Sequence, residues 1–160
     1  MRQVSQILDT EHRAALDLLG RLEQALSGRS RVAAGDPRLA ELSAALVVLL
    51  EHDTSRHFEF EESELFTRLT QAGEGNIAEL LTEEHEAMRA VASELLPLAR
   101  AGAAGTLHGA ALESYRLGVL EIVERQVSHI QKETMALLPL LDDLLDEAID
   151  SELSMRYASS

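Results

Sequence analysis

Two pairs of potential metal ligands occur in the chain at the same internal spacing. Glu61 lies four residues after His57, and Glu133 lies four residues after His129. A spacing of four places both side chains on one face of a helix, one turn apart. Glutamate is frequent in this acidic chain, so the spacing alone is weak evidence for a metal site.

The order of these residues recurs in both halves of the chain, which is stronger evidence. His12 lies 45 positions before His57, and His85 lies 44 positions before His129. Each half therefore supplies one single histidine and one histidine–glutamate pair. Imidazole nitrogens combined with carboxylate oxygens suit iron and manganese and also accept zinc. We interpret the repeat as two halves of one metal site.

Hydrophobic periodicity predicts four long helices joined by short turns. The expected helices span Val4–Ser27, Pro37–Ala72, Asn76–Ala101 and Thr106–Leu138. Long helices with short connections predict an all-α protein, an up-down-up-down antiparallel four-helix bundle. We expect Pro97 to bend or shorten the third helix and Pro139 to end or kink the fourth. We place the bundle in residues 1–141 and an acidic helical extension in residues 142–160, with a frayed tail from Ser154 to Ser160.

The predicted helices place the candidate ligands at one level of the bundle. At about 1.5 Å per residue, His12 and His85 lie roughly 12 Å inside the starts of the first and third helices. Glu61 and His129 lie roughly 16 Å and 14 Å before the ends of the second and fourth helices. These ends coincide in an antiparallel bundle, so the four histidines and two glutamates converge on one buried layer. Such a layer costs several kcal/mol without a compensating cation.

Composition excludes several other classes of protein. The formal net charge of −14 is unsuited to nucleic acid and to an anionic membrane surface. The chain has no cysteine, so disulfides, thiolate zinc sites and iron–sulfur clusters are excluded. No apolar stretch approaches the roughly 20 residues of a membrane span. The N-terminal residues do not form a signal peptide, and we expect a soluble, cytoplasmic protein.

Two segments resemble the hemerythrin-like, or HHE, cation-binding family. They are HFEFEESELF at residues 57–66 and HIQKETMALLPLL at residues 129–141, and the resemblance covers about residues 5–141. It implies two iron ions with an oxo or hydroxo bridge, for which zinc or manganese could substitute. It also implies terminal histidine ligands and two bridging glutamates: His12, His57, His85, His129, Glu61 and Glu133.

The chain departs from the oxygen-carrying hemerythrins at two places. Those proteins have five histidine ligands, two of them one turn apart on the third helix. Here the positions one turn from His85 hold Leu81 and Arg89. The second bridging residue of those proteins is an aspartate five positions after its histidine, whereas this chain has Glu133 at four and Thr134 at five. We therefore expect a more symmetric site with more open coordination positions.

This resemblance implies that the protein binds or activates dioxygen, peroxide or nitric oxide, in oxidative or nitrosative stress. Whether it turns over peroxide or nitric oxide enzymatically is left open. The first alternative is a non-catalytic module that senses or stores oxygen or iron. The second is a metal-free or zinc-stabilised bundle that serves as an interaction protein. We expect a monomer or a weak homo-oligomer.

Other polar residues are assigned no role in the metal site. His52 and His108 lie off the ligand layer, and we expect both at the surface. Glu62 points away from the ligand face and is expected to be solvated. Glu64, one turn beyond the ligand layer, is a weak candidate for a supporting carboxylate. Tyr115 is about four helical turns from His129, too far to reach the metals.

Overall fold

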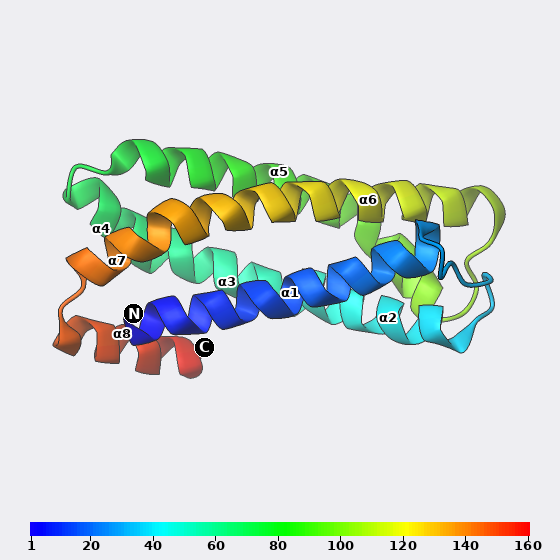
Figure 1. Ribbon diagram of the computed structural model, residues 1–160, viewed down its shortest axis with the longest axis horizontal. Coiled ribbons are helices and arrows are strands. Elements are labelled where there is room, and N and C mark those ends of the chain that lie inside the picture. The colour runs from blue at the N-terminus through cyan, green and yellow to red at the C-terminus, as the bar shows by residue number, and fades with distance from the viewer.

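Four helical rods run side by side along the long axis of the molecule (Figure 1). The computed structural model describes residues 1–160 and contains helices and no strands. The first rod is α1 (Gln3–Ser27), and the second consists of α2 (Pro37–Val48), η1 (Leu49–Asp53), α3 (Thr54–Phe60), η2 (Glu61–Leu65) and α4 (Phe66–Gln71). The third rod is α5 (Gly75–Ala103), and the fourth consists of α6 (Gly109–Lys132), η3 (Glu133–Leu137) and α7 (Leu138–Leu144). Neighbouring rods pack in the order first, second, third, fourth and back to the first. The predicted all-α four-helix bundle is confirmed.

Local sequence signals explain where the second rod begins and ends. The Asp36 side chain accepts a hydrogen bond from the backbone N–H of Arg38, which caps the start of α2, and Pro37 occupies a first-turn position where its missing N–H costs nothing. Beyond α4, Gly73 adopts a φ of 89°, a conformation that glycine tolerates without strain. The second rod therefore begins after the Asp36 cap and ends before Gly73.

Three turns of π-helix interrupt the α-helical rods, and the sequence did not predict them. They are η1 and η2 in the second rod and η3 in the fourth. A π-helical turn adds one residue to the i→i+4 repeat and rotates the side chains that follow. The second helix, expected as one continuous α-helix, is therefore continuous in direction but not in hydrogen-bonding pattern.

Neither proline ends its helix. α5 continues past Pro97 to Ala103, held by its packing against α2 and α6. The fourth rod continues past Pro139 to Leu144. Because η3 ends one residue before α7 begins, Pro139 lies in the first turn of α7, where proline is tolerated.

The core consists of two hydrophobic clusters. One contains Leu8 and Leu81, and the other contains Leu19 and Met88. His12 lies between Leu8 and Leu19 along α1, and His85 lies between Leu81 and Met88 along α5. The candidate ligands therefore form a polar layer between two apolar ones, as the helical spacing predicted.

A further helix, α8 (Glu147–Ala158), packs beside the start of α1, so that both chain termini lie at the same end of the molecule (Figure 1). The buried Asp150 side chain accepts hydrogen bonds from the backbone N–H groups of Gln3 (2.8 Å) and Val4 (2.9 Å). Tyr157 is only 2% exposed. The prediction of a frayed tail is therefore wrong for residues 154–158, because Tyr157 anchors them. The proposed domain boundary at residue 141 stays a prediction.

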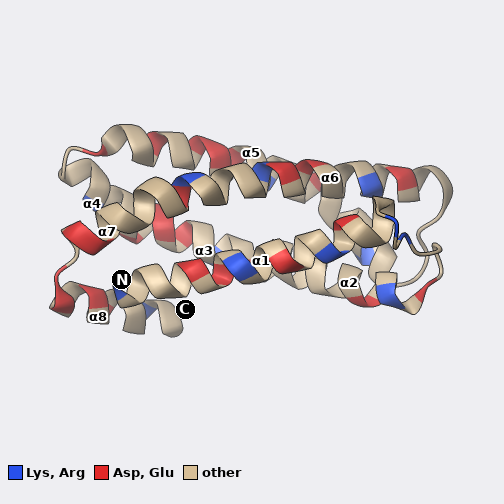
Figure 2. Cartoon of the chain, viewed as in Figure 1, with Lys and Arg blue, Asp and Glu red and all other residues tan.

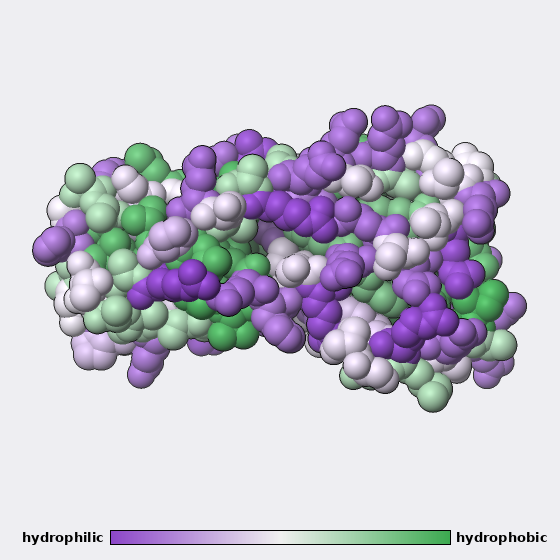
Figure 3. Space-filling view, turned by 180° about the vertical axis from the view of Figure 1, so that it is seen from behind, coloured by the Kyte–Doolittle hydropathy of each residue, from purple (hydrophilic) through white to green (hydrophobic).

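The surface is predominantly polar. Acidic residues are spread along the rods and outnumber basic ones (Figure 2), 28 to 14 over the whole chain. On the face opposite to that of Figure 1, hydrophilic residues are interspersed with smaller hydrophobic areas (Figure 3). None of the helices combines the length and the apolar character needed to cross a bilayer.

Candidate metal centre

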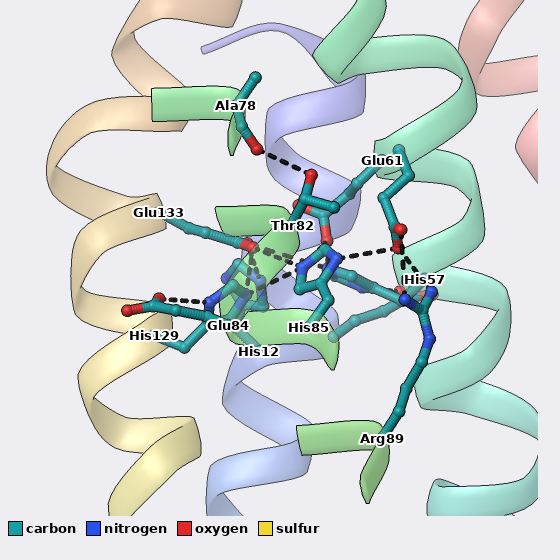
Figure 4. Close-up of polar contacts among 12 residues, drawn as sticks. His12, His57, Glu61, Ala78, Thr82, Glu84, His85, Arg89, His129 and Glu133 are labelled. Atoms are coloured by element: carbon teal, nitrogen blue, oxygen red, sulfur yellow. Dashed lines mark hydrogen bonds and ion pairs between the residues drawn. The ribbon is translucent and has the colours of Figure 1, made fainter. Parts of the chain in front are cut away.

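Six side chains from the four rods meet in the polar layer between the hydrophobic clusters (Figure 4). All six are buried, and three of them have no solvent exposure at all. They are His12 of α1, His57 and Glu61 of the second rod, His85 of α5, and His129 and Glu133 of the fourth rod. The structure thus brings together every residue that the sequence suggested as a ligand.

The two glutamates lie where the rods change from α-helix to π-helix. Glu61 is the first residue of η2 and Glu133 is the first residue of η3. In each rod the preceding α-helical turn presents a histidine, His57 or His129, on the same face. Turns of π-helix inside α-helices are frequent at functional sites. Both halves of the internal repeat therefore build the same local unit.

Glu133 directs its two carboxylate oxygens at different pairs of histidines. Its Oε2 lies 2.7 Å from Nε2 of His12 and 4.0 Å from Nε2 of His57. Its Oε1 lies 2.5 Å from Nε2 of His129 and 3.6 Å from Nε2 of His85. A carboxylate in this position can be shared by two cations, one beside each histidine pair.

Glu61 completes the centre from the opposite side. Its Oε1 lies 3.0 Å from Nε2 of His57 and 3.6 Å from Nε2 of His85, so it approaches one histidine of each pair. Two groups of potential ligand atoms result, each with all its atoms within 4.8 Å of one another. One group is Glu61, His85, His129 and Glu133, and the other is His12, His57 and Glu133. Glu133 is the member that the two groups share.

The buried carboxylates lack hydrogen-bond partners. Both oxygens of Glu61 and both oxygens of Glu133 are buried and accept no hydrogen bond. Nε2 of His12 also forms none, although it lies 2.7 Å from Glu133, because the two groups are not aligned for one. Each unsatisfied buried polar group costs about 1–3 kcal/mol, and a charged one costs more. A cation between these atoms removes that cost, and imidazole and carboxylate ligands without thiolate fit iron or manganese.

Charge interactions between the two glutamates separate their pKa values. Burial and the negative charge of Glu133 raise the pKa of Glu61 to about 8. Burial also opposes ionisation of Glu133, but its contacts with His12 and His129 outweigh burial and hold the pKa of Glu133 well below its ordinary value. Two adjacent buried carboxylates resist carrying two negative charges. Without a cation Glu61 therefore holds a proton at neutral pH, and a cation bound here would displace it.

Three of the four histidines are oriented by a carboxylate on the side away from the centre. An ionised carboxylate only accepts hydrogen bonds, so Nδ1 of each imidazole donates to it, and Nε2 is the nitrogen that faces the centre, where a cation would bind. Such carboxylate–histidine pairs orient metal-binding imidazoles and raise their basicity. The pairs are His57 with Glu11 (2.7 Å), His85 with Glu62 (3.1 Å) and His129 with Glu84 (2.9 Å).

These three outer carboxylates were missed in the sequence. Glu62, which was expected to be solvated, is only partly exposed: its Oε2 accepts hydrogen bonds from His85 and from Arg89 (2.5 Å). Glu84 is held by Lys132. Glu11 accepts a hydrogen bond of 2.6 Å from the hydroxyl of Tyr157 in α8.

The outer carboxylates follow a cyclic order around the bundle. Each is adjacent in sequence to one ligand but serves a histidine of the next rod: Glu11 of α1 serves the second rod, Glu62 of the second rod serves α5, and Glu84 of α5 serves the fourth rod. By the internal repeat, the residue of the fourth rod equivalent to Glu62 is Thr134. Nδ1 of His12 is buried and has no hydrogen-bond partner. The cyclic order of outer carboxylates is therefore incomplete at His12, because the fourth position is occupied by Thr134.

Two aromatic rings pack against His85. The ring of Phe58 stacks on it with centroids 3.8 Å apart, and the ring of Phe66 lies 5.5 Å away at an interplanar angle of 28°. One turn from His85, Leu81 belongs to the hydrophobic core and Arg89 pairs with a carboxylate. Neither position can supply a fifth imidazole, in agreement with the sequence.

The remaining polar residues named in the sequence lie away from the centre. His52 and His108 are exposed, as expected. Glu64 forms an ion pair with Arg156 (2.7 Å) and contacts none of the histidines. Tyr115 is buried in the second hydrophobic cluster, where its hydroxyl shares a hydrogen bond with Ser43 (2.9 Å).

Comparison with known proteins gives one positive finding. The family model described as the hemerythrin HHE cation-binding domain matches residues 3–141. No curated protein matches the chain. The matched range contains all six candidate ligands and ends before α8, so the Tyr157 side chain that supports Glu11 comes from outside it.

Proposed function

Because the chain belongs to the family of hemerythrin HHE cation-binding domains, we propose that its six buried histidine and glutamate residues hold two iron ions. We propose further that this centre binds or activates dioxygen, peroxide or nitric oxide, in defence against oxidative or nitrosative stress. The proposed ligands are His12, His57, Glu61, His85, His129 and Glu133.

The observation that carries this proposal is the position of Glu133. Its two oxygens face different histidine pairs, at 2.7 Å from His12 and at 2.5 Å from His129, and neither oxygen has a hydrogen-bond partner. A carboxylate that bound a single cation would not need to face two different histidine pairs. The arrangement supports one ion beside His12 and His57 and a second beside His85 and His129.

The protein's own residues prepare such a centre in three ways. The outer carboxylates fix the imidazole rings with Nε2 facing inward. Phe58 and Phe66 cover His85 and keep water from that side. Two imidazoles and shared carboxylate oxygens would leave positions open on each ion. Iron ions held there would supply electrons to a small molecule bound at these open positions.

A second candidate function is non-catalytic binding, in which the centre senses or stores oxygen or iron. One observation favours it: each outer carboxylate already accepts a hydrogen bond from a ligand histidine. These three carboxylates are therefore already engaged as acceptors and are not free to deliver protons repeatedly, which turnover of peroxide requires.

Timed decay of peroxide and of nitric oxide separates the two functions. Iron-loaded wild type is compared with Glu133→Ala and with Tyr115→Phe, a control at a buried position away from the centre. Catalytic use predicts consumption that is lost in Glu133→Ala and kept in the control. Two bound irons without consumption of either molecule would favour the binding function, and a chain that binds no iron would refute both.

A further inference from the structure

A mostly apolar cavity of about 560 Å³ lies between α1, the second rod and α6. Its walls are formed largely by small and aliphatic side chains: Ala14, Ala15, Leu18, Ala45, Val48 and Leu49. Pockets for small organic ligands have volumes of about 300–1,000 Å³ and mainly apolar walls with a few polar groups. The cavity is many times larger than a water-sized molecule, which occupies about 30 Å³.

The inner end of the cavity reaches the candidate metal centre. His12, His57 and His129 are among its lining residues. A molecule bound in the cavity would therefore contact imidazoles of both histidine pairs. Among them is His12, the one histidine without an outer carboxylate.

Gln126 supplies a polar group that has no partner in the protein. It is only 5% exposed, it lines the cavity one turn before His129, and its side chain forms no hydrogen bond. It also lines a second cavity of about 300 Å³ on the other side. A side-chain amide offers both a donor and an acceptor, and the polar atoms of this amide are not fully buried, so they stay accessible to a molecule in the cavity. A ligand with a carbonyl or hydroxyl group would satisfy it.

The charges around the cavity limit the ligand further. Glu11 and Asp53 line it, and no lysine or arginine does. Without a bound cation, carboxylate or phosphate groups are therefore repelled.

We propose that this cavity binds an uncharged, largely apolar organic molecule whose single carbonyl or hydroxyl group forms hydrogen bonds with Gln126. Binding depends on the walls and on the amide, and needs no metal ion. The location of the ligand beside two iron ions rests on the proposed function.

Three probes of similar shape test the proposal: acetophenone, ethylbenzene and benzoate. Each is titrated by calorimetry and by amide NMR into protein as purified and into chelator-treated protein. We expect acetophenone to bind with one site per chain in both preparations, and benzoate to bind at least tenfold more weakly in the chelator-treated protein. Gln126→Leu should weaken acetophenone about fivefold, the effect of one hydrogen bond, and leave ethylbenzene unchanged.

Two neighbouring alanines of α2 provide a matched pair of variants. Ala45 lines the cavity and Ala44 lines none of the cavities described here, while both are exposed. Ala45→Phe should fill the cavity and abolish binding of the probes, whereas Ala44→Phe should bind as wild type does. Equal binding by the two variants, or equal affinity for all three probes, would overturn the proposal. Iron binding without acetophenone binding would leave the proposed function intact and remove this inference alone.

Discussion

Replacing Glu62 with glutamine tests whether the outer carboxylates support the metal centre. Glu62 accepts a hydrogen bond from Nδ1 of His85 (3.1 Å) and forms an ion pair with Arg89. Glutamine has nearly the same shape and keeps one acceptor oxygen, so His85 should stay in place. The substitution removes the negative charge of Glu62, which makes the imidazole of His85 a stronger metal ligand.

The expected loss follows from that difference. Removing a partner of a metal-binding histidine lowers metal affinity about 10- to 100-fold, or roughly 1.4–2.8 kcal/mol at 1.4 kcal/mol per factor of ten. Because glutamine still accepts the hydrogen bond, Glu62→Gln should lie near the tenfold end. Glu62→Ala removes both the charge and the acceptor and should lie near the hundredfold end.

Glu64 provides the matched control two residues further along η2. Its side chain is 24% exposed, compared with 26% for Glu62, and it too pairs with an arginine, Arg156. A partly exposed ion pair contributes about 0–1 kcal/mol to stability, so both glutamine variants should unfold at similar temperatures. Glu64→Gln should bind metal within about twofold of wild type, because no histidine contacts it.

Affinity is measured by competition between the protein and a chelator for ferrous iron without oxygen, and for zinc. A loss confined to the Glu62 variants supports the assigned role of the outer carboxylates. Equal metal affinities of Glu62→Gln and Glu64→Gln would refute that role, because the contact of Glu62 with His85 would then have no effect on metal binding.

Three further predictions concern the same network. The pKa of Glu61 is raised from 4.5 to about 8, so between these values the folded metal-free protein holds a proton that the unfolded chain loses. Its stability should therefore fall as the pH rises from about 4.5 to 8. Glu61→Gln should raise the melting temperature at pH 8 and not at pH 4.5. Tyr157→Phe, which removes a hydrogen bond to Glu11, should weaken metal binding severalfold in the chelator assay, whereas Tyr115→Phe should cost about 0.5–1.5 kcal/mol of stability and leave metal affinity unchanged. Thr134→Glu should strengthen metal binding by giving His12 a carboxylate partner, and Met135→Glu, an added charge at an exposed neighbour, should not; identical affinities of these two variants would contradict the cyclic order.

Helical periodicity and the repeated halves were sufficient to predict the bundle and the meeting of the six polar residues. Leu8 and Leu19 flank His12 on one face of α1, and that pattern is local and therefore readable in the sequence. Antiparallel packing then fixes the level at which the rods meet. The assignment of these six residues as ligands stays a prediction.

The outer carboxylates could not be predicted in the same way. Glu11 and Glu84 each precede a ligand histidine, but each serves a histidine of a different rod. Such contacts depend on how each rod is rotated about its own axis relative to its neighbours, and helical spacing within one rod does not predict that rotation. Adjacency to a ligand was the one available signal, and it is weak where glutamate is common.

The π-helical turns and the packed C-terminus also depend on tertiary contacts. Nothing in the local sequence at Glu61 or Glu133 distinguishes a π-helical turn from an α-helical one. Tyr157 lies in a segment that is polar overall, but its ring packs against Phe60, with centroids 4.5 Å apart, and against Arg56. Together with the buried Leu153, this residue packs a tail whose composition indicated fraying.

A crystal structure of the iron-loaded protein with anomalous diffraction measured at the iron absorption edge tests the central claim most directly. Two anomalous peaks are predicted for each chain, one beside His12 and His57 and one beside His85 and His129, with the carboxylate of Glu133 between them. A single peak, or peaks elsewhere with the oxygens of Glu133 still uncoordinated, would contradict the account.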